Sequence, residues 1–157
     1  MKGDPKVIAL LNEALKSELT AINQYFLHGE MCSNWGYKKL YKQLRMEAID
    51  EMKHAEQLME RILYLDGAPS VGELFRVNIG RNVKEQIEND LKLEVEAVAR
   101  YNKGIKLCES AQDGGSRELL KSILVNEEEH VDRLEAQLHS IKEMGIQNFL
   151  AQQLYTE

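Results

Sequence analysis

The chain has 157 residues, of which 43% are hydrophobic, and a formal charge of -6 at pH 7. This length suffices for one compact domain with a sizeable core, so we expect a single domain over residues 1–157. No basic cluster interleaved with aromatic residues occurs, and nucleic-acid binding is therefore not expected. The opening segment lacks the apolar region of a signal peptide, and no stretch approaches about 18 consecutive apolar residues. We therefore expect a cytoplasmic protein that spans no membrane.

The first two expected helices follow the opening of the chain. Asp4 and Pro5 are typical of a helix start, and apolar residues then recur with helical spacing as far as a break near residues 34–36. A second run with the same period carries Leu40, Leu58 and Leu65 and stops at residues 66–69, where Gly and Pro interrupt it.

Two further long helices are expected in the second half. Asn82 with Glu85 forms a plausible capping box for a third helix, which we expect to stop at residues 113–115. A fourth helix follows and ends at Gly145, a typical C-terminal cap, and a short tail helix is expected over residues 146–154.

The connections predict how these helices are arranged. Short turns join the first to the second and the third to the fourth, so each pair should form an antiparallel hairpin. Between the hairpins lie residues 66–81, which at ~3.3 Å per extended residue could span roughly 50 Å. A helix of about 29 residues is roughly 44 Å long, so this segment can cross the whole bundle. The fold class expected is an all-α, four-helix bundle with a long crossover and a short fifth helix, an arrangement that resembles ferritin-like bundles.

A repeated pattern of glutamate, tyrosine and histidine relates the two halves. Glu51 follows Glu18 by 33 positions, and Glu127 follows Glu94 by the same number. The second glutamate of each half is followed three residues later by a histidine, and the first is followed seven residues later by a tyrosine: His54 and His130, Tyr25 and Tyr101.

The repeated glutamates occupy positions where a helix needs apolar residues. In the first helix Glu18 lies in the stripe of Leu15 and Ile22, and in the third Glu94 lies between Leu91 and Val98. The Glu-x-x-His pairs of the second and fourth helices interrupt apolar stripes in the same way. We therefore expect six polar groups pointing inward at one level: Glu18, Glu51, His54, Glu94, Glu127 and His130.

Buried metal ions explain this pattern best. An isolated buried carboxylate costs several kcal/mol, so four of them need compensating charge. Four glutamates balance two Fe(II) ions, or two Fe(III) ions bridged by an oxide. Carboxylate and imidazole ligands suit iron or manganese and leave positions open for dioxygen. One Glu-x-x-His among 26 acidic residues could arise by chance, but two copies at matched offsets favour a redox-active metal centre.

Other residue patterns exclude some sites and leave others open. Cys32 and Cys108 are the only cysteines, which excludes a four-cysteine iron site and a disulfide scaffold and predicts ordinary buried thiols. Glu47 either lines the route by which iron reaches the centre or is a solvated carboxylate. For His28 and His139 we expect surface positions or positions behind the ligands.

Three stretches resemble the bacterioferritin family over essentially the whole chain: AINQYFLH at 21–28, DEMKHAE at 50–56 and EEEH at 127–130. The resemblance implies a ferroxidase and iron-storage subunit that oxidises Fe(II) with dioxygen or hydrogen peroxide. It implies two iron ions per subunit with six ligands. Glu18 with His54 would bind one ion, Glu94 with His130 would bind the other, and Glu51 and Glu127 would bridge the two.

The resemblance further implies a shell of 24 subunits built from dimers, and a ferredoxin as the partner for iron release. It implies haem b shared between two subunits, with Met52 as axial ligand. The chain departs from the family at Met46, where bacterioferritins often have a histidine that forms an iron site on the inner surface together with Asp50. Tyr25 either donates an electron to the centre or is a buried tyrosine hydrogen-bonded to Glu94.

Two other functions are alternatives to a ferroxidase and iron-storage subunit. A di-manganese catalase or a related di-metal oxidase or peroxidase would use a similar bundle and ligand set. A structural bundle or a carrier of haem alone would need no metal ligands, and it leaves the six polar residues in core positions without an explanation.

Overall fold

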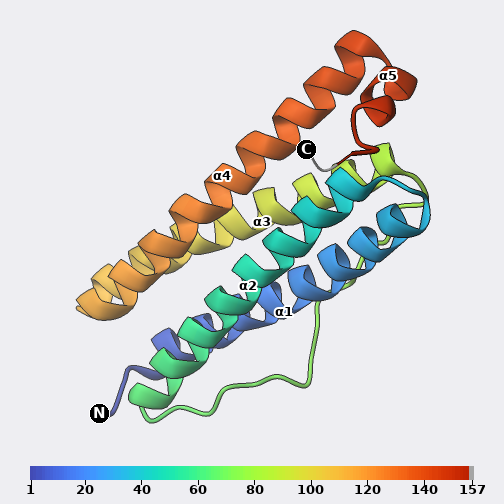
Figure 1. Cartoon of the computed structure of the whole chain (residues 1–157). Coiled ribbons are helices and arrows are strands. Elements are labelled where there is room, and N and C mark those ends of the chain that lie inside the picture. Colours follow the sequence, from blue (N-terminus) through green and yellow to red (C-terminus); the bar gives the residue numbers. More distant parts are fainter. Residues whose placement is uncertain (156–157) are drawn as a thin grey trace.

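The computed structural model describes residues 1–155, which form five helices and no strand. The bounds are α1 (Pro5–Asn34), α2 (Lys38–Tyr64), α3 (Val83–Ser110), α4 (Gly114–Met144) and α5 (Ile146–Ala151). As Figure 1 shows, α1 lies along α2 and α3 along α4, and the two hairpins pack into one bundle with α5 beyond the end of α4. The expected all-α bundle with a short fifth helix is confirmed.

The helix starts are those that the sequence predicts. The Asp4 side chain accepts a hydrogen bond from the Lys6 amide at 2.8 Å, and Asn82 accepts one from the Glu85 amide at 2.9 Å. These caps satisfy backbone donors that have no partner inside the helix. Gly145, after α4, has a φ of 82°, as expected of a C-terminal cap.

Two predicted boundaries are wrong. The third helix ends at Ser110, and the two glycines at 114–115 are the first residues of α4. Asp113 takes the N-cap of α4 by accepting from the Ser116 amide at 3.0 Å, so the aspartate and not the glycines sets the turn. The tail helix ends at Ala151 instead of 154.

The segment between α2 and α3 crosses the bundle as predicted, running from one end of the molecule to the other (Figure 1). Three side chains on one face of α1 fasten it. Thr20 accepts from the Phe75 amide at 2.9 Å, Gln24 accepts from an amide at residue 78 at 3.1 Å, and His28 Nε2 accepts from the Gly80 amide at 2.9 Å. Spacing by four residues puts these groups in one row along the helix.

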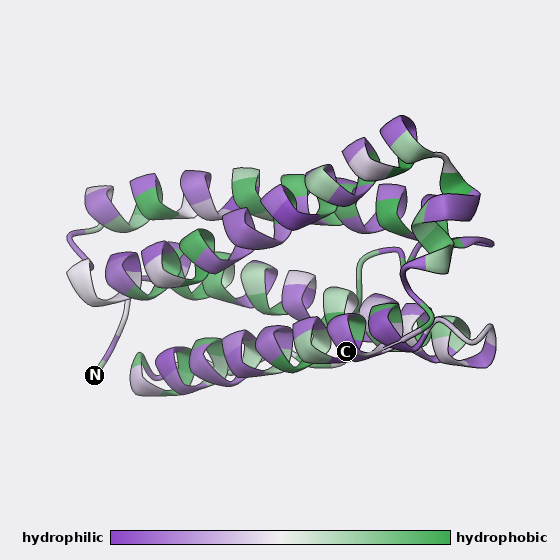
Figure 2. Ribbon diagram, turned by 45° about the horizontal axis from the view of Figure 1, so that its top comes forward, coloured by the Kyte–Doolittle hydropathy of each residue, from purple (hydrophilic) through white to green (hydrophobic). Residues whose placement is uncertain are grey.

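Hydrophobic and hydrophilic stretches alternate along the long helices in Figure 2, and the buried residues form separate clusters. One cluster includes Leu11, Leu58 and Leu120, and a second includes Leu40 and Leu134. Each long helix carries one or two of the six predicted ligand positions. On every helix these positions lie between residues of the first cluster and residues of the second. Within residues 1–155 no helix is both long enough and apolar enough to cross a membrane.

Candidate metal centre

The four long helices bring all six predicted residues together. Their ligand atoms form two groups, and within each group the atoms lie within 4.8 Å of one another. The two groups overlap because both contain the same two glutamates. One consists of Glu18, Glu51, His54 and Glu127, and the other of Glu51, Glu94, Glu127 and His130. The two shared glutamates are the residues that the resemblance assigns as bridges, and this assignment stays a prediction.

All six side chains are buried, with His54 the most exposed at 7%. Each stands on a helix face whose neighbours are apolar, so the hydrophobic packing of the bundle turns these polar groups inward. The i, i+3 spacing puts His54 above Glu51 and His130 above Glu127, so two helices contribute two ligands each.

The hydrogen-bond pattern leaves these groups with free ligand atoms. Among the described residues, the buried side-chain atoms that lack a hydrogen-bond partner belong to the six residues and to one further pair, Glu47 and Arg133. Both oxygens of Glu127, one oxygen each of the other three glutamates and Nδ1 of each histidine are in this set. Buried polar atoms without partners are rare in folded proteins. Two metal ions, each bound by carboxylates and one imidazole, would satisfy those of the six residues.

The electrostatics of the site point to missing positive charge. Burial raises the pKa of Glu51 and Glu94 well above the usual value, and the charges of neighbouring glutamates raise it further. Burial lowers the pKa of His54, but the carboxylates of Glu127 and Glu18, whose oxygens lie 2.9 Å and 3.5 Å from its Nδ1, outweigh this and raise the pKa to about 9. Protons therefore collect in the site without metal, and bound cations would displace them.

Two tyrosines hold the terminal glutamates from behind. The Tyr25 hydroxyl donates to Glu94, and the Tyr101 hydroxyl donates to Glu18, so each tyrosine contacts the glutamate of the other half. The hydrogen bond expected between Tyr25 and Glu94 is confirmed. Tyr101 was not predicted as a site residue, although its match to Tyr25 in the repeat was a usable signal.

Further polar residues connect the site to its surroundings. Asp50, with 42% of its side chain exposed, lies 3.4 Å from Nε2 of His130 and so links the centre to the surface of α2. Met46 is 59% exposed and lies one turn from Asp50. Met52 is 54% exposed and faces away from the centre, beside the exposed Ile49.

The solvated alternative for Glu47 is wrong. This carboxylate is buried and forms an ion pair with Arg133, a residue that sequence reasoning missed. His28 is fully buried, with Nδ1 at 2.9 Å from Asp90, and is not on the surface, whereas His139 is exposed. Helical periodicity places such residues on a face, but it does not identify a partner on another helix.

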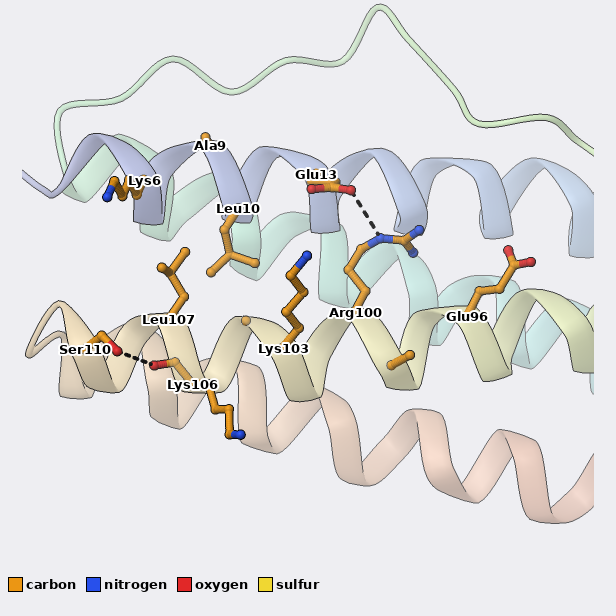
Figure 3. Close-up of a pocket in the computed structure, with 12 residues that line it drawn as sticks. Lys6, Ala9, Leu10, Glu13, Glu96, Arg100, Lys103, Lys106, Leu107 and Ser110 are labelled. Atoms are coloured by element: carbon orange, nitrogen blue, oxygen red, sulfur yellow. Dashed lines mark hydrogen bonds and ion pairs between the residues drawn. The ribbon is translucent and has the colours of Figure 1, made fainter.

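An open groove lies elsewhere and contains none of the six residues. It measures about 860 Å³ between α1 and α3, and Figure 3 shows Leu10 of α1 and Leu107 of α3 pointing toward each other, with Lys103 and Arg100 farther along α3. Arg100 is paired with Glu13 at 3.7 Å across the groove.

Comparison with known proteins agrees with the site. A family model described as a ferritin-like domain matches residues 8–144. Bacterioferritin of Mycolicibacterium paratuberculosis is 47% identical over 152 residues, which cover 97% of this chain and 96% of the relative. The chain belongs to the bacterioferritin family.

Other members of the family match equally far along the chain. Bacterioferritin BfrA of Mycobacterium tuberculosis is 47% identical over 97% of this chain and 96% of its own length. Bacterioferritin of Streptomyces coelicolor is 46% identical over 96% of this chain and 90% of its own length. Membership of this family supports iron binding and iron storage in general, and a di-manganese catalase is not favoured.

Proposed function

We propose that this chain is a ferroxidase and iron-storage subunit. It binds two Fe(II) ions as substrate, one at Glu18 with His54 and one at Glu94 with His130, with Glu51 and Glu127 bridging the two. The observation that carries this proposal is the pair of overlapping ligand groups, in which every residue has at least one buried oxygen or nitrogen without a hydrogen-bond partner in the described chain.

The residues of the centre prepare it for oxidation of iron. The two shared glutamates would hold both cations close together, so two Fe(II) ions, each able to give one electron, would lie beside the same dioxygen molecule. Each Fe(II) loses one electron, and dioxygen takes two electrons and two protons to give hydrogen peroxide. Tyr25 and Tyr101 orient the terminal carboxylates by donating to them and leave the remaining oxygens for the cations.

The assembly belongs to the same proposal. We infer a shell of 24 chains that stores ferric mineral in the cytoplasm, with peroxide as an alternative oxidant and a ferredoxin as partner for iron release. The exposed Met52 and Ile49 support an interface between two chains on α2, with the Met52 thioether as axial ligand of a shared haem b. Size exclusion with an absorption spectrum of Met52→Leu tests this part, since a shell that keeps its haem would contradict it.

The ferroxidase proposal is tested by rapid mixing of Fe(II) with oxygenated protein. Glu94→Ala should abolish the fast phase of oxidation, because one terminal carboxylate is lost. The matched control is Glu96→Ala, two residues along α3, where the side chain is exposed and should not matter. If Glu94→Ala oxidises iron as fast as Glu96→Ala, the assignment of the centre is wrong.

The competing metal is tested separately. A di-manganese enzyme would contain manganese as purified and would decompose peroxide without retaining iron. Elemental analysis of the purified protein, followed by iron loading in air, distinguishes the two functions. Retained ferric iron supports storage, and firmly bound manganese with no retained iron contradicts it.

A further inference from the structure

The pair of Glu47 and Arg133 breaks the symmetry of the two halves. Glu47 lies four residues before Glu51 on α2, one turn from the centre. The equivalent position in the second half, four residues before Glu127, is Ile123, an ordinary core residue. A buried carboxylate therefore extends the acidic centre on one side only.

The contacts of Glu47 resemble those of the six ligands. Its side chain is 4% exposed, and its Oε1 contacts Nη2 of Arg133, while Oε2 has no hydrogen-bond partner within residues 1–155. Nε and Nη2 of Arg133 also lack well-aligned hydrogen bonds in this part of the chain. Outside the ligand set these are the only described residues with such atoms, so this pair is held by charge and not by good hydrogen-bond geometry.

A small cavity of about 20 Å³ lies beside Glu47. Asp90 and three glutamine side chains line it together with Glu47, five apolar residues complete the lining, and Arg133 is not among the lining residues. A cavity of roughly 10–15 Å³ accepts one water-sized particle. Oxygen donors of this kind are typical ligands of hard divalent cations. Burial raises the pKa of Glu47 to about 7, and Arg133 opposes this by stabilising the charged form.

We propose that the Arg133 guanidinium takes the place of a third cation beside Glu47 and so limits the centre to two metal ions. A buried carboxylate needs a positive partner, and a permanently charged side chain supplies it without occupying a metal. Arg133 thus determines metal stoichiometry, and Glu47 becomes a cation ligand when that charge is removed. The inference rests on the two-metal centre proposed above.

Binding of Co²⁺ tests this inference, because Co²⁺ stays divalent in air and the number of ions bound per chain can be measured. In equilibrium dialysis of the metal-free, assembled protein, wild type should bind two ions per chain and Arg133→Gln three. Arg133→Met keeps the apolar stem of the side chain and should also bind three, which provides a second variant if the first does not fold. Arg133→Lys keeps the charge and should bind two.

The controls separate this inference from the function itself. Arg133→Gln combined with Glu47→Gln should return to two ions, because the third ligand is gone. Arg117→Gln removes a surface arginine paired with Glu109 at 2.9 Å and should leave two. Two ions in folded Arg133→Gln or Arg133→Met, or three in the double variant, would overturn the inference. Fewer than two in wild type would instead contradict the two-metal centre.

Discussion

Replacing Glu94 by glutamine should stabilise the protein when metal is removed. Glu94 is fully buried, and burial followed by the charge of Glu127 raises its pKa well above 4.5. The folded chain therefore keeps a proton that the unfolded chain releases at neutral pH, which costs stability. Glutamine retains an oxygen that can accept from the Tyr25 hydroxyl but has no charge to bury.

The size of this effect follows from the pKa shift. If the native pKa of Glu94 lies above the working pH, the cost is 1.36 kcal/mol for each pH unit between 4.5 and that pH. At pH 7.5 the difference is three units, so the upper bound is about 4 kcal/mol. For a chain of this length about 2–4 °C of unfolding temperature corresponds to 1 kcal/mol, so the midpoint should rise by at most roughly 8–16 °C.

Thermal unfolding of chelator-treated wild type and Glu94→Gln measures this difference. Because the raised pKa belongs to an acid, wild type loses stability as pH rises above 4.5, and the gap between the two proteins should shrink to nothing near pH 4.5. Saturating Co²⁺ should reverse the order, since only wild type has the full ligand set. A metal-free Glu94→Gln that is less stable than wild type at pH 7.5 would refute the reasoning.

Three further outcomes are expected. Leu58→Ala empties a fully buried core position and should cost about 2–5 kcal/mol in the free energy of unfolding, measured by denaturant titration; a loss below about 1 kcal/mol would contradict the packing described. In Gly80→Ala the new Cβ would lie 2.3 Å from the backbone nitrogen of Gln86, so limited proteolysis should cut the crossover faster than in wild type while circular dichroism reports unchanged helix. Burial raises the pKa of Cys32 to about 12 and of Cys108 to about 11, so iodoacetamide should leave both thiols unmodified in native protein and alkylate both in guanidinium; rapid native labelling would argue against their burial.

The helices and the ligand set could be predicted because both depend on local periodicity. Apolar spacing, the caps at Asp4 and Asn82 and the break at residues 66–69 gave the long helices. The two Glu-x-x-His pairs at a matched offset were recognisable because a helix repeats every 3.6 residues and turns residues three apart to the same side. The turn before α4 was misread because Gly114 and Gly115 are the first residues of the helix and the Asp113 side chain supplies its cap.

The partners of buried polar residues needed the fold. Glu47 and Arg133 are 86 positions apart, and nothing in their local spacing distinguishes a buried pair from two solvated side chains. For His28 the sequence left a surface position and a position behind the ligands open, and only the fold shows that its Nε2 accepts from the Gly80 amide of the crossover. Such contacts depend on how each helix is rotated about its axis and how far it is shifted along its neighbours. Many packing contacts together determine both quantities.

The sequence by itself therefore determined that this protein has four long helices and six inward-facing carboxylate and imidazole side chains, since a repeating pattern along one helix is enough to define a face. Only the tertiary structure decided that the tyrosine of each half donates to the glutamate of the other half, and that an arginine balances the charge of a fifth buried glutamate. The physical reason is that burial and charge pairing depend on which helices face each other, whereas a pattern along the sequence describes only one helix at a time.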